Sequence, residues 1–413
     1  MRHVVILGAG TAGTIMANRL MRLLAREVRA QELTITVVDR DDRHLYQPGL
    51  LFIPFGTYGE RDVVKPRRRT LPAQVNLVLG DVARIDVAGS VVELADGRAL
   101  PYDVLVVATG AHLHPGKTAG LTGAGWRERV FDFYTLDGAL ALRDALAAFK
   151  GGRLLVNAVD VPIKCPVALL EFAVLADACF TERDVREQVA ITVAMPVDAS
   201  PTAPAVGALL NRLVVKKDMT LVTEFNTVRV DGANGVLHSR DGRQLAFDLL
   251  VTIPLHGGAP FVSRSAGLGD EHGYVIVDPH LLQARCAPNI FALGDAAALP
   301  SAKSGAMAQL ESRALAPNIA RYLRRVPLAR SFDGHTHDVV ETGFNRAMLV
   351  ESNLSADPTS GNFRFDGDPV PGFEDSRLAH EAHRAFRWAY WNVVLPGRDL
   401  PGTPQPPPGG NAP

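Results

Sequence analysis

Short apolar runs alternate with amphipathic stretches along most of the chain. Residues 3–7, HVVIL, predict a buried strand, and residues 14–24 place apolar side chains at helical spacing. A second apolar strand, LTITVVD over residues 33–39, follows this helix. Strand, helix and strand in this order predict an α/β fold built on a parallel sheet.

The same alternation returns in the middle of the chain. Residues 129–149 predict a helix whose N-cap lies near Thr135 or Asp137. Residues 151–159 then predict a strand, and residues 166–180 a helix with apolar positions at helical spacing. Further strands are expected within residues 188–197, 219–231 and 244–255. The middle of the chain is therefore a second α/β unit of the same kind.

The first turn carries the spacing G-x-G-x-x-G at Gly8, Gly10 and Gly13. The first glycine permits a tight turn, the second lets the backbone approach a pyrophosphate, and the third brings the helix against the strand. Asp39 ends the second strand, where an acid can hydrogen-bond a ribose hydroxyl. These features predict a dinucleotide site; the alternative is a tight turn without a ligand.

Two later segments narrow the choice of dinucleotide. Residues 102–111 predict a strand followed by a small-residue turn with Thr109 and Gly110, and residues 287–297 a strand that ends in Gly294 and Asp295. The three glycine-bearing segments, at these separations, resemble the disulfide-reductase-like flavoproteins with two dinucleotide domains. In that family the late Gly-Asp binds the ribityl and pyrophosphate region of FAD, so the resemblance implies FAD.

The second α/β unit lacks the glycines of a nucleotide loop. Its turn is VDVPIKCP over residues 159–166, where branched side chains block a pyrophosphate and prolines remove N–H donors. Binding of NAD(P)H is therefore not expected here, and another electron donor is needed. Cys165 is the candidate, since the start of a helix and the adjacent Lys164 would lower the pKa of its thiol. The alternative is a buried structural cysteine.

The stretch PIKCP at residues 162–166 resembles the sulfide:quinone oxidoreductase family, with flavocytochrome c sulfide dehydrogenase as a relative. The resemblance continues in order at residues 45–56, 62–72, 252–262, 291–311, 332–351 and 386–398. It implies two Rossmann-like dinucleotide-binding domains and a C-terminal α+β region. The expected boundaries are 1–118 with 255–330 for the FAD domain, 119–254 for the second domain, 331–398 for the C-terminal region and 399–413 for a disordered tail.

In that family sulfide adds to a bridged cysteine pair beside the flavin, and a quinone reoxidises the flavin. One cysteine corresponds to Cys165, but the position of the second is Asp338, so a trisulfide bridge cannot form. The departure favours a substrate that brings its own thiol or persulfide sulfur. Asp338 is then a base or substrate contact, or else a solvated carboxylate. The resemblance adds Arg40, Pro48 and Lys303 to the residues expected at FAD.

Three other features carry weaker signals. The run His335, His337, Asp338 and Glu341 contains metal-ligand types, but it matches a family loop and no metal is expected. The basic run over residues 65–70 predicts a solvated surface or a patch for an acidic partner. The aromatic-rich segment 386–398 fits a membrane interface near a quinone site, or else a helix that caps the FAD domain or contacts a second subunit.

Composition limits the remaining choices. The chain has 413 residues and a formal net charge of −1, which favours neither nucleic acid nor an acidic membrane. Its three cysteines do not suggest a disulfide scaffold; Cys179 is expected in the core and Cys286 in a structural loop. No apolar run reaches the length of a membrane span, and the first strand leaves no room for a signal peptide. A cytoplasmic protein, in peripheral contact with a membrane or free of it, is expected.

The leading hypothesis is an FAD-dependent oxidoreductase of the sulfide:quinone oxidoreductase type. Cys165 would react with sulfide, a thiol or a persulfide, and a quinone or another carrier would accept the electrons. A type II NADH:quinone reductase is the second hypothesis, and the turn without glycines argues against it. A third is a non-catalytic FAD-binding partner of a sulfur-transfer protein.

Overall fold

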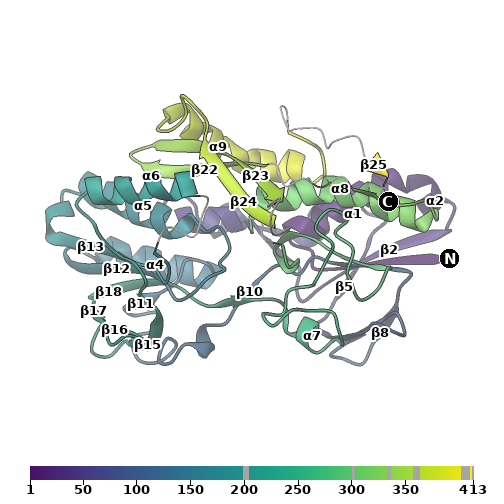
Figure 1. Ribbon diagram of the computed structural model, residues 1–413, viewed down its shortest axis with the longest axis horizontal. Helices are drawn as coiled ribbons and strands as arrows, with labels where there is room; N and C mark the ends of the chain where they lie inside the picture. Colours follow the sequence, from purple (N-terminus) through teal and green to yellow (C-terminus); the bar gives the residue numbers. More distant parts are fainter. Residues whose placement is uncertain are drawn as a thin grey trace.

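The computed structural model describes residues 1–198, 204–299, 303–330, 332, 336–356, 363–400 and 410–411. In Figure 1 two lobes lie side by side, and the C-terminal elements lie along one side of both. The first lobe contains the N-terminal strands and the second contains the inserted α/β unit.

A five-stranded parallel sheet of order β20-β9-β1-β2-β5 forms the first lobe. Helices α1 and α8 pack on it with a core that includes Ile6, Met16 and Phe291. The bounds are β1 Arg2–Leu7, α1 Thr11–Leu23, β2 Leu33–Asp39, β5 Asn76–Leu79, β9 Val104–Val107, β20 Ile290–Ala292 and α8 Gly305–Leu323. An antiparallel meander lies between β5 and β9: β6 Val82–Asp86, β7 Val91–Leu94 and β8 Ala99–Pro101.

The second lobe repeats this plan with the order β11-β18-β12-β13-β14, again all parallel. The bounds are β11 Val130–Phe131, α4 Leu136–Ala148, β12 Gly152–Ala158, α5 Ala168–Glu182, β13 Val189–Ala194, α6 Pro204–Lys216, β14 Thr220–Val222 and β18 Leu249–Ile253. Its meander is β15 Thr227–Asp231, β16 Val236–Ser239 and β17 Gln244–Ala246. Thr135 caps α4 by accepting from the amide of Gly138, as one of the two expected caps.

The C-terminal region is an antiparallel sheet followed by a helix. Its elements are β22 Thr336–Gly343, β23 Arg346–Ala356, β24 Phe363–Pro369, α9 Arg377–Ala389 and the π-helical turn η6 Tyr390–Val394. β22 contacts both α5 of the second lobe and α8 of the first. The C-terminal region thus lies against both lobes, close to where they join.

Smaller elements complete the chain: α2 Ala25–Arg29, β3 Arg43–Leu45, the 3₁₀ turn η1 Gln47–Phe52, α3 Glu60–Val63, β4 Val64–Pro66, β10 His112–Leu113, β19 His256–Gly257, α7 Pro260–Ser263, the 3₁₀ turn η5 Gly294–Ala296, β21 Ala329–Arg330 and β25 Gly410–Asn411. The chain crosses between the lobes at β10 and β19, which pair with each other.

The predicted α/β class with two Rossmann-like domains and a C-terminal α+β region is confirmed. Of the predicted tail, Asp399 pairs with Arg19 and Arg313, and β25 pairs with β21. Residues 401–409 and 412–413 lie outside the described residues. Among the described helices, none has the length and apolar character needed to cross a membrane.

Candidate active site

The glycine turn between β1 and α1 has the geometry that its spacing predicts. Gly8 has φ +94°, and a Cβ at Gly13 would lie 1.8 Å from the carbonyl oxygen of Gly8. A Cβ at Gly10 would meet nothing within 4 Å. The turn therefore leaves open space above Gly10, at the amino end of α1, where a phosphate would be bound.

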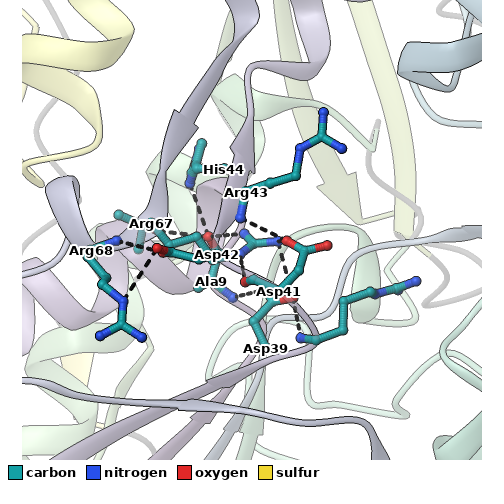
Figure 2. A network of polar contacts seen from close by, with 10 residues as sticks. Ala9, Asp39, Asp41, Asp42, Arg43, His44, Arg67 and Arg68 are labelled. Atoms are coloured by element: carbon teal, nitrogen blue, oxygen red, sulfur yellow. Dashed lines mark hydrogen bonds and ion pairs between the residues drawn. The ribbon is translucent and has the colours of Figure 1, made fainter.

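Asp39 is held beside this turn by backbone and by a buried arginine (Figure 2). Its carboxylate accepts from the amide of Ala9 at 2.6 Å and from its neighbour Arg40 at 2.7 Å. The Arg67 guanidinium lies 3.1 Å from the other side of this carboxylate and donates to the carbonyl of Ala9 at 2.7 Å. Arg67 is only 8% exposed. The surface interpretation of residues 65–70 is therefore wrong for Arg67, although it suits the exposed Arg68.

A second buried contact ties the C-terminal region to the same turn. His44 bonds the carbonyl of Ala9 at 3.0 Å and the Tyr390 hydroxyl at 2.8 Å, and that hydroxyl lies 2.7 Å from Thr11 Oγ1. Burial lowers the pKa of His44 to about 3, so the imidazole is neutral. The end of α9 is thus fixed to the first residue of α1.

The two later segments predicted at the cofactor converge on this edge of the sheet. Gly110 and Gly294 adopt φ values of +70° and +65°. Thr109 Oγ1 is buried without a hydrogen-bond partner, and Asp295 follows Gly294 in η5 beyond β20. A buried hydroxyl without a partner beside an open glycine turn fits a bound dinucleotide, so the residues present suit the predicted cofactor.

We expect Gly10→Ala to weaken flavin binding without loss of fold. The added methyl group enters open space in the protein, so the Tm of the flavin-free protein should not change. It would occupy the space expected for the pyrophosphate and weaken binding by about tenfold, which corresponds to roughly 1.4 kcal/mol. Titration of flavin-free protein with FAD, followed by flavin fluorescence, measures the change. Equal affinity in both proteins would contradict this placement of the cofactor.

Lys303 and Glu311 lie behind the Gly-Asp turn. Lys303 Nζ donates to the carbonyls of Asp295 at 3.0 Å and Ala297 at 3.1 Å. Glu311, which the sequence did not single out, is 1% exposed and accepts from the amide of Gly294. Burial raises the pKa of Glu311 to about 8, so this carboxyl group is mostly protonated at neutral pH.

The raised pKa of Glu311 makes the protein less stable as pH rises. The unfolded chain releases the Glu311 proton near the ordinary pKa of a glutamate, and the folded protein releases it only near pH 8. The folded protein therefore loses stability as pH rises between those two values. We expect Glu311→Gln to remove that loss, because the amide oxygen still accepts from Gly294. Tm should rise relative to the native protein at pH 8.5 and change little at pH 5. A difference independent of pH would contradict the assignment.

Cys165 lies in the turn before α5, with φ +46°. Its amide donates to the carbonyl of Lys303 at 3.0 Å, so the turn touches the first lobe just before α8. Its Sγ lies 4.0 Å from Glu171 Oε2. Burial, followed by the carboxyl groups of Glu171 and Asp338, raises the pKa of the thiol well above its usual value. The expectation of a lowered thiol pKa is therefore wrong for this protein.

Asp338 lies close enough to Cys165 to raise the pKa of its thiol. Burial raises the pKa of Asp338 itself to about 6, although a hydrogen bond from Ser304, the N-cap of α8, lowers it. β22 thus brings Asp338 to the thiol across the junction of the lobes. Of the run weighed as metal ligands, His335 lies outside the described residues.

Glu171, like Glu311, was not singled out from the sequence. It is 2% exposed on the first turn of α5, and burial raises its pKa to about 7. Its Oε1 accepts a hydrogen bond from the amide of Glu341 at 2.8 Å, and its Oε2 faces Cys165. The available signal was a single acid inside the apolar run ALLEFAVL, six residues after the cysteine.

Lys164 does not point at the sulfur. Its Nζ donates to Gln47 Oε1 at 3.1 Å, in the same turn as Pro48, and Tyr134 donates to its carbonyl at 2.7 Å. Burial lowers the pKa of Lys164. Lys164 therefore places a cation between the two lobes rather than beside the thiol.

The other two cysteines cannot pair with Cys165. Cys179 lies near the end of α5, about 16 Å along the helix from its start. Cys286 is exposed and lies near Gly267 in the first lobe. Among the described residues, the thiol site therefore contains one cysteine, and the carboxyl groups of Glu171, Asp338 and Asp295 act on it.

The paired Rossmann-like domains, with an open glycine turn in the first, are those of an oxidoreductase of the two-dinucleotide-domain class. Residues 2–313 match the family described as pyridine nucleotide-disulphide oxidoreductase. The chain belongs to this family.

Individual relatives confirm the predicted resemblance to sulfide:quinone oxidoreductases. The mitochondrial sulfide:quinone oxidoreductase of Mus musculus is 25% identical over 96% of this chain and 86% of that protein. The type II NADH:quinone oxidoreductase NdhA of Mycobacterium tuberculosis is 26% identical over 78% of this chain and 72% of that protein. The structure of the sulfide:quinone oxidoreductase from Aquifex aeolicus superposes with a TM-score of 0.81 at 20% identity, covering 97% of this chain and 93% of that one.

Proposed function

We propose that the chain is an FAD-dependent oxidoreductase of the sulfide:quinone oxidoreductase type, with Cys165 as its sulfur-reactive residue. The observation that carries the proposal is the thiol itself, which occupies the turn where a nucleotide-binding loop would lie and has two carboxyl groups beside it. The similarity to sulfide:quinone oxidoreductases over nearly the whole chain supports it.

FAD, when bound, supplies a two-electron acceptor at the junction of the lobes. Gly8, Gly10 and Gly13 would hold its pyrophosphate, and Asp39 with Arg40 its adenosine ribose. The remaining predicted contacts are Pro48, Thr109, Gly110, Gly294, Asp295 and Lys303. The open space above Gly10 and the unpaired hydroxyl of Thr109 support this placement.

The raised pKa of the thiol means that Cys165 is protonated at neutral pH, so its reaction needs a base. Glu171, with a pKa of about 7 and an oxygen 4.0 Å from the sulfur, is suited to accept that proton. Cys165–SH and HS⁻ then give Cys165–S–SH, with loss of one proton to Glu171 and of two electrons. The new S–S bond replaces the S–H bond of the cysteine.

A site with one cysteine must pass its sulfur on. A thiolate RS⁻ attacks the outer sulfur of Cys165–S–SH, which forms RS–SH and releases the Cys165 thiolate to be reprotonated. Asp338, at the position of the missing second cysteine, then acts as a substrate contact or second base rather than as a sulfur carrier. A small thiol or persulfide is thus the expected co-substrate.

A quinone is the proposed electron acceptor. Tyr46, Tyr390 and Trp391 form an aromatic cluster between η1 and the end of α9, with ring centroids 4.7 to 6.3 Å apart. Trp391 Nε1 is buried in it without a partner and could donate to a carbonyl oxygen. Leu378 and Trp388 are exposed on α9, which suits peripheral contact with a membrane that carries the quinone. Pairing of two copies through this helix is the alternative use of that face.

An anaerobic donor screen tests the proposal. Flavin absorbance is followed after addition of sulfide, a low-molecular-weight persulfide or NADH at equal concentration. We expect bleaching by a sulfur donor and restoration of the absorbance by a soluble quinone. Bleaching by NADH alone would overturn the sulfur chemistry.

The second candidate is a type II NADH:quinone reductase, favoured by the similarity to NdhA. Against it, the second lobe has a nine-residue connection between β12 and α5 that contains Asp160 and two prolines, where the first lobe has three residues between β1 and α1. Rapid flavin reduction by NADH in the same screen would select this candidate.

A further inference from the structure

A buried carboxylate with two imidazoles links β22 to α9. Glu341 is fully buried, and its two carboxylate oxygens bond His380 Nδ1 at 2.9 Å and His383 Nδ1 at 2.8 Å. The two histidines are three residues apart, on one face of α9. Because each Nδ1 faces the carboxylate, Nε2 is the ring nitrogen of each histidine that points away from it.

The same glutamate connects this group to the thiol site. The amide of Glu341 donates to Glu171 Oε1, and Glu171 Oε2 faces the sulfur of Cys165. His383 lowers the pKa of both Glu171 and Asp338, so its ring lies within electrostatic reach of both carboxyl groups. It also packs edge-on against Phe52, with centroids 5.2 Å apart.

Among the described residues, the charged groups near this cluster come from α5, β22, α3 and α9 itself. Glu171 on α5 and Asp338 on β22 face the group from the thiol side. On the other side lie the Tyr58 hydroxyl, which interacts with Glu341, and the pair Arg387–Asp62, with Arg384 nearby. The imidazoles therefore lie between a carboxyl-rich site and the outer face of α9.

We propose that Glu341, His380 and His383 form a proton-transfer group between the thiol site and the acceptor at α9. The inference rests on the proposed function. Oxidation of Cys165–SH with HS⁻ releases two electrons and one proton, whereas reduction of a quinone to a quinol consumes two electrons and two protons. The group receives the first proton by way of Glu171, takes the second from solvent at α9, and gives both to the quinone.

Two acceptors separate proton transfer from support of the fold. The bound flavin is reduced chemically with dithionite, so no sulfur donor is needed, and is then mixed with a soluble quinone or with ferricyanide, which takes electrons without protons. We expect Glu341→Gln and His383→Gln to slow reoxidation of the flavin by the quinone about tenfold or more. The rate of reoxidation by ferricyanide should stay within about twofold of the native rate. Glu381→Gln, an exposed residue of the same helix, is the matched control.

A loss shared by both acceptors would mean that the group only holds α9 in place, and no loss with either would mean that it carries no protons; each result overturns the inference. If Glu341→Gln does not fold, His383→Ala with added imidazole tests proton transfer in its place. Recovery of the quinone rate alone supports proton transfer, and its absence opposes it. Failure of the native protein to be reoxidised by quinone would instead reject the acceptor in the proposed function, before any variant is compared.

Discussion

Cys165→Ser should abolish flavin reduction by sulfide and by persulfides while the flavin stays bound. Serine lacks a sulfur that can form an S–S bond, so no electron pair can be released at this position. We expect a rate at least about 10³-fold lower, as is usual when a covalent nucleophile is removed. Anaerobic stopped-flow absorbance of the flavin measures it. Reduction by dithionite should not change, because it needs no cysteine.

Cys179→Ser is the matched control, since Cys179 lies on the same helix as the thiol turn but well away from Glu171. It should reduce its flavin at the native rate. Equal bleaching of the native protein and Cys165→Ser would end the cysteine mechanism. Loss of bleaching in both variants would point to a structural effect on α5 instead of chemistry at one sulfur.

The structure explains why the helix-start argument gave the wrong direction for the thiol pKa. That argument considers a partly exposed helix end with a cation beside it. Here burial has the largest effect, two carboxyl groups lie nearby, and Lys164 is directed at Gln47. Only the hydrogen bond from the amide of Ala168 acts in the predicted direction. A protonated thiol beside a carboxyl group therefore replaces the expected thiolate.

Features encoded by short spacings were predictable, and those made by distant segments were not. Gly8, Gly10 and Gly13 lie in one turn, so their spacing was enough to predict the geometry of that turn. Arg67 was missed because its partners, Asp39 and the carbonyl of Ala9, lie about 30 and 60 residues away. A run of three arginines gives no sign of which one is buried.

The thiol site itself shows the same division. Asp338 could be placed near Cys165 only through the family resemblance, because 173 residues separate them in the chain. Glu171 is local, yet its helix is apolar on nearly every side, and helical periodicity alone could not show which side faces the sulfur. In the structure, the amide of Glu341 on β22 donates to one carboxylate oxygen of Glu171, and this contact shows how the side chain is oriented.

Glu171→Gln should slow flavin reduction by sulfide about 10²-fold, the usual scale for loss of a positioned base. The pKa of about 7 means that the carboxylate is present above pH 7 and absent below it, so the native rate should rise with pH through that value. The glutamine variant should lack this rise. Ionisation of the donor affects both proteins equally and cancels in the ratio of their rates.

Unfolding cannot account for that loss. A carboxyl pKa raised by burial costs stability as pH rises from its ordinary value to about 7, so the neutral amide should leave Tm at pH 8 equal or higher. Glu182→Gln, at the exposed end of the same helix, should keep both the native rate and its pH dependence. A rise that remains in Glu171→Gln would instead identify Asp338, whose pKa is also raised by burial, as the base. The Glu171→Gln variant thus distinguishes the two carboxyl groups beside Cys165, because a pH-dependent rise survives in it only if Asp338 is the base.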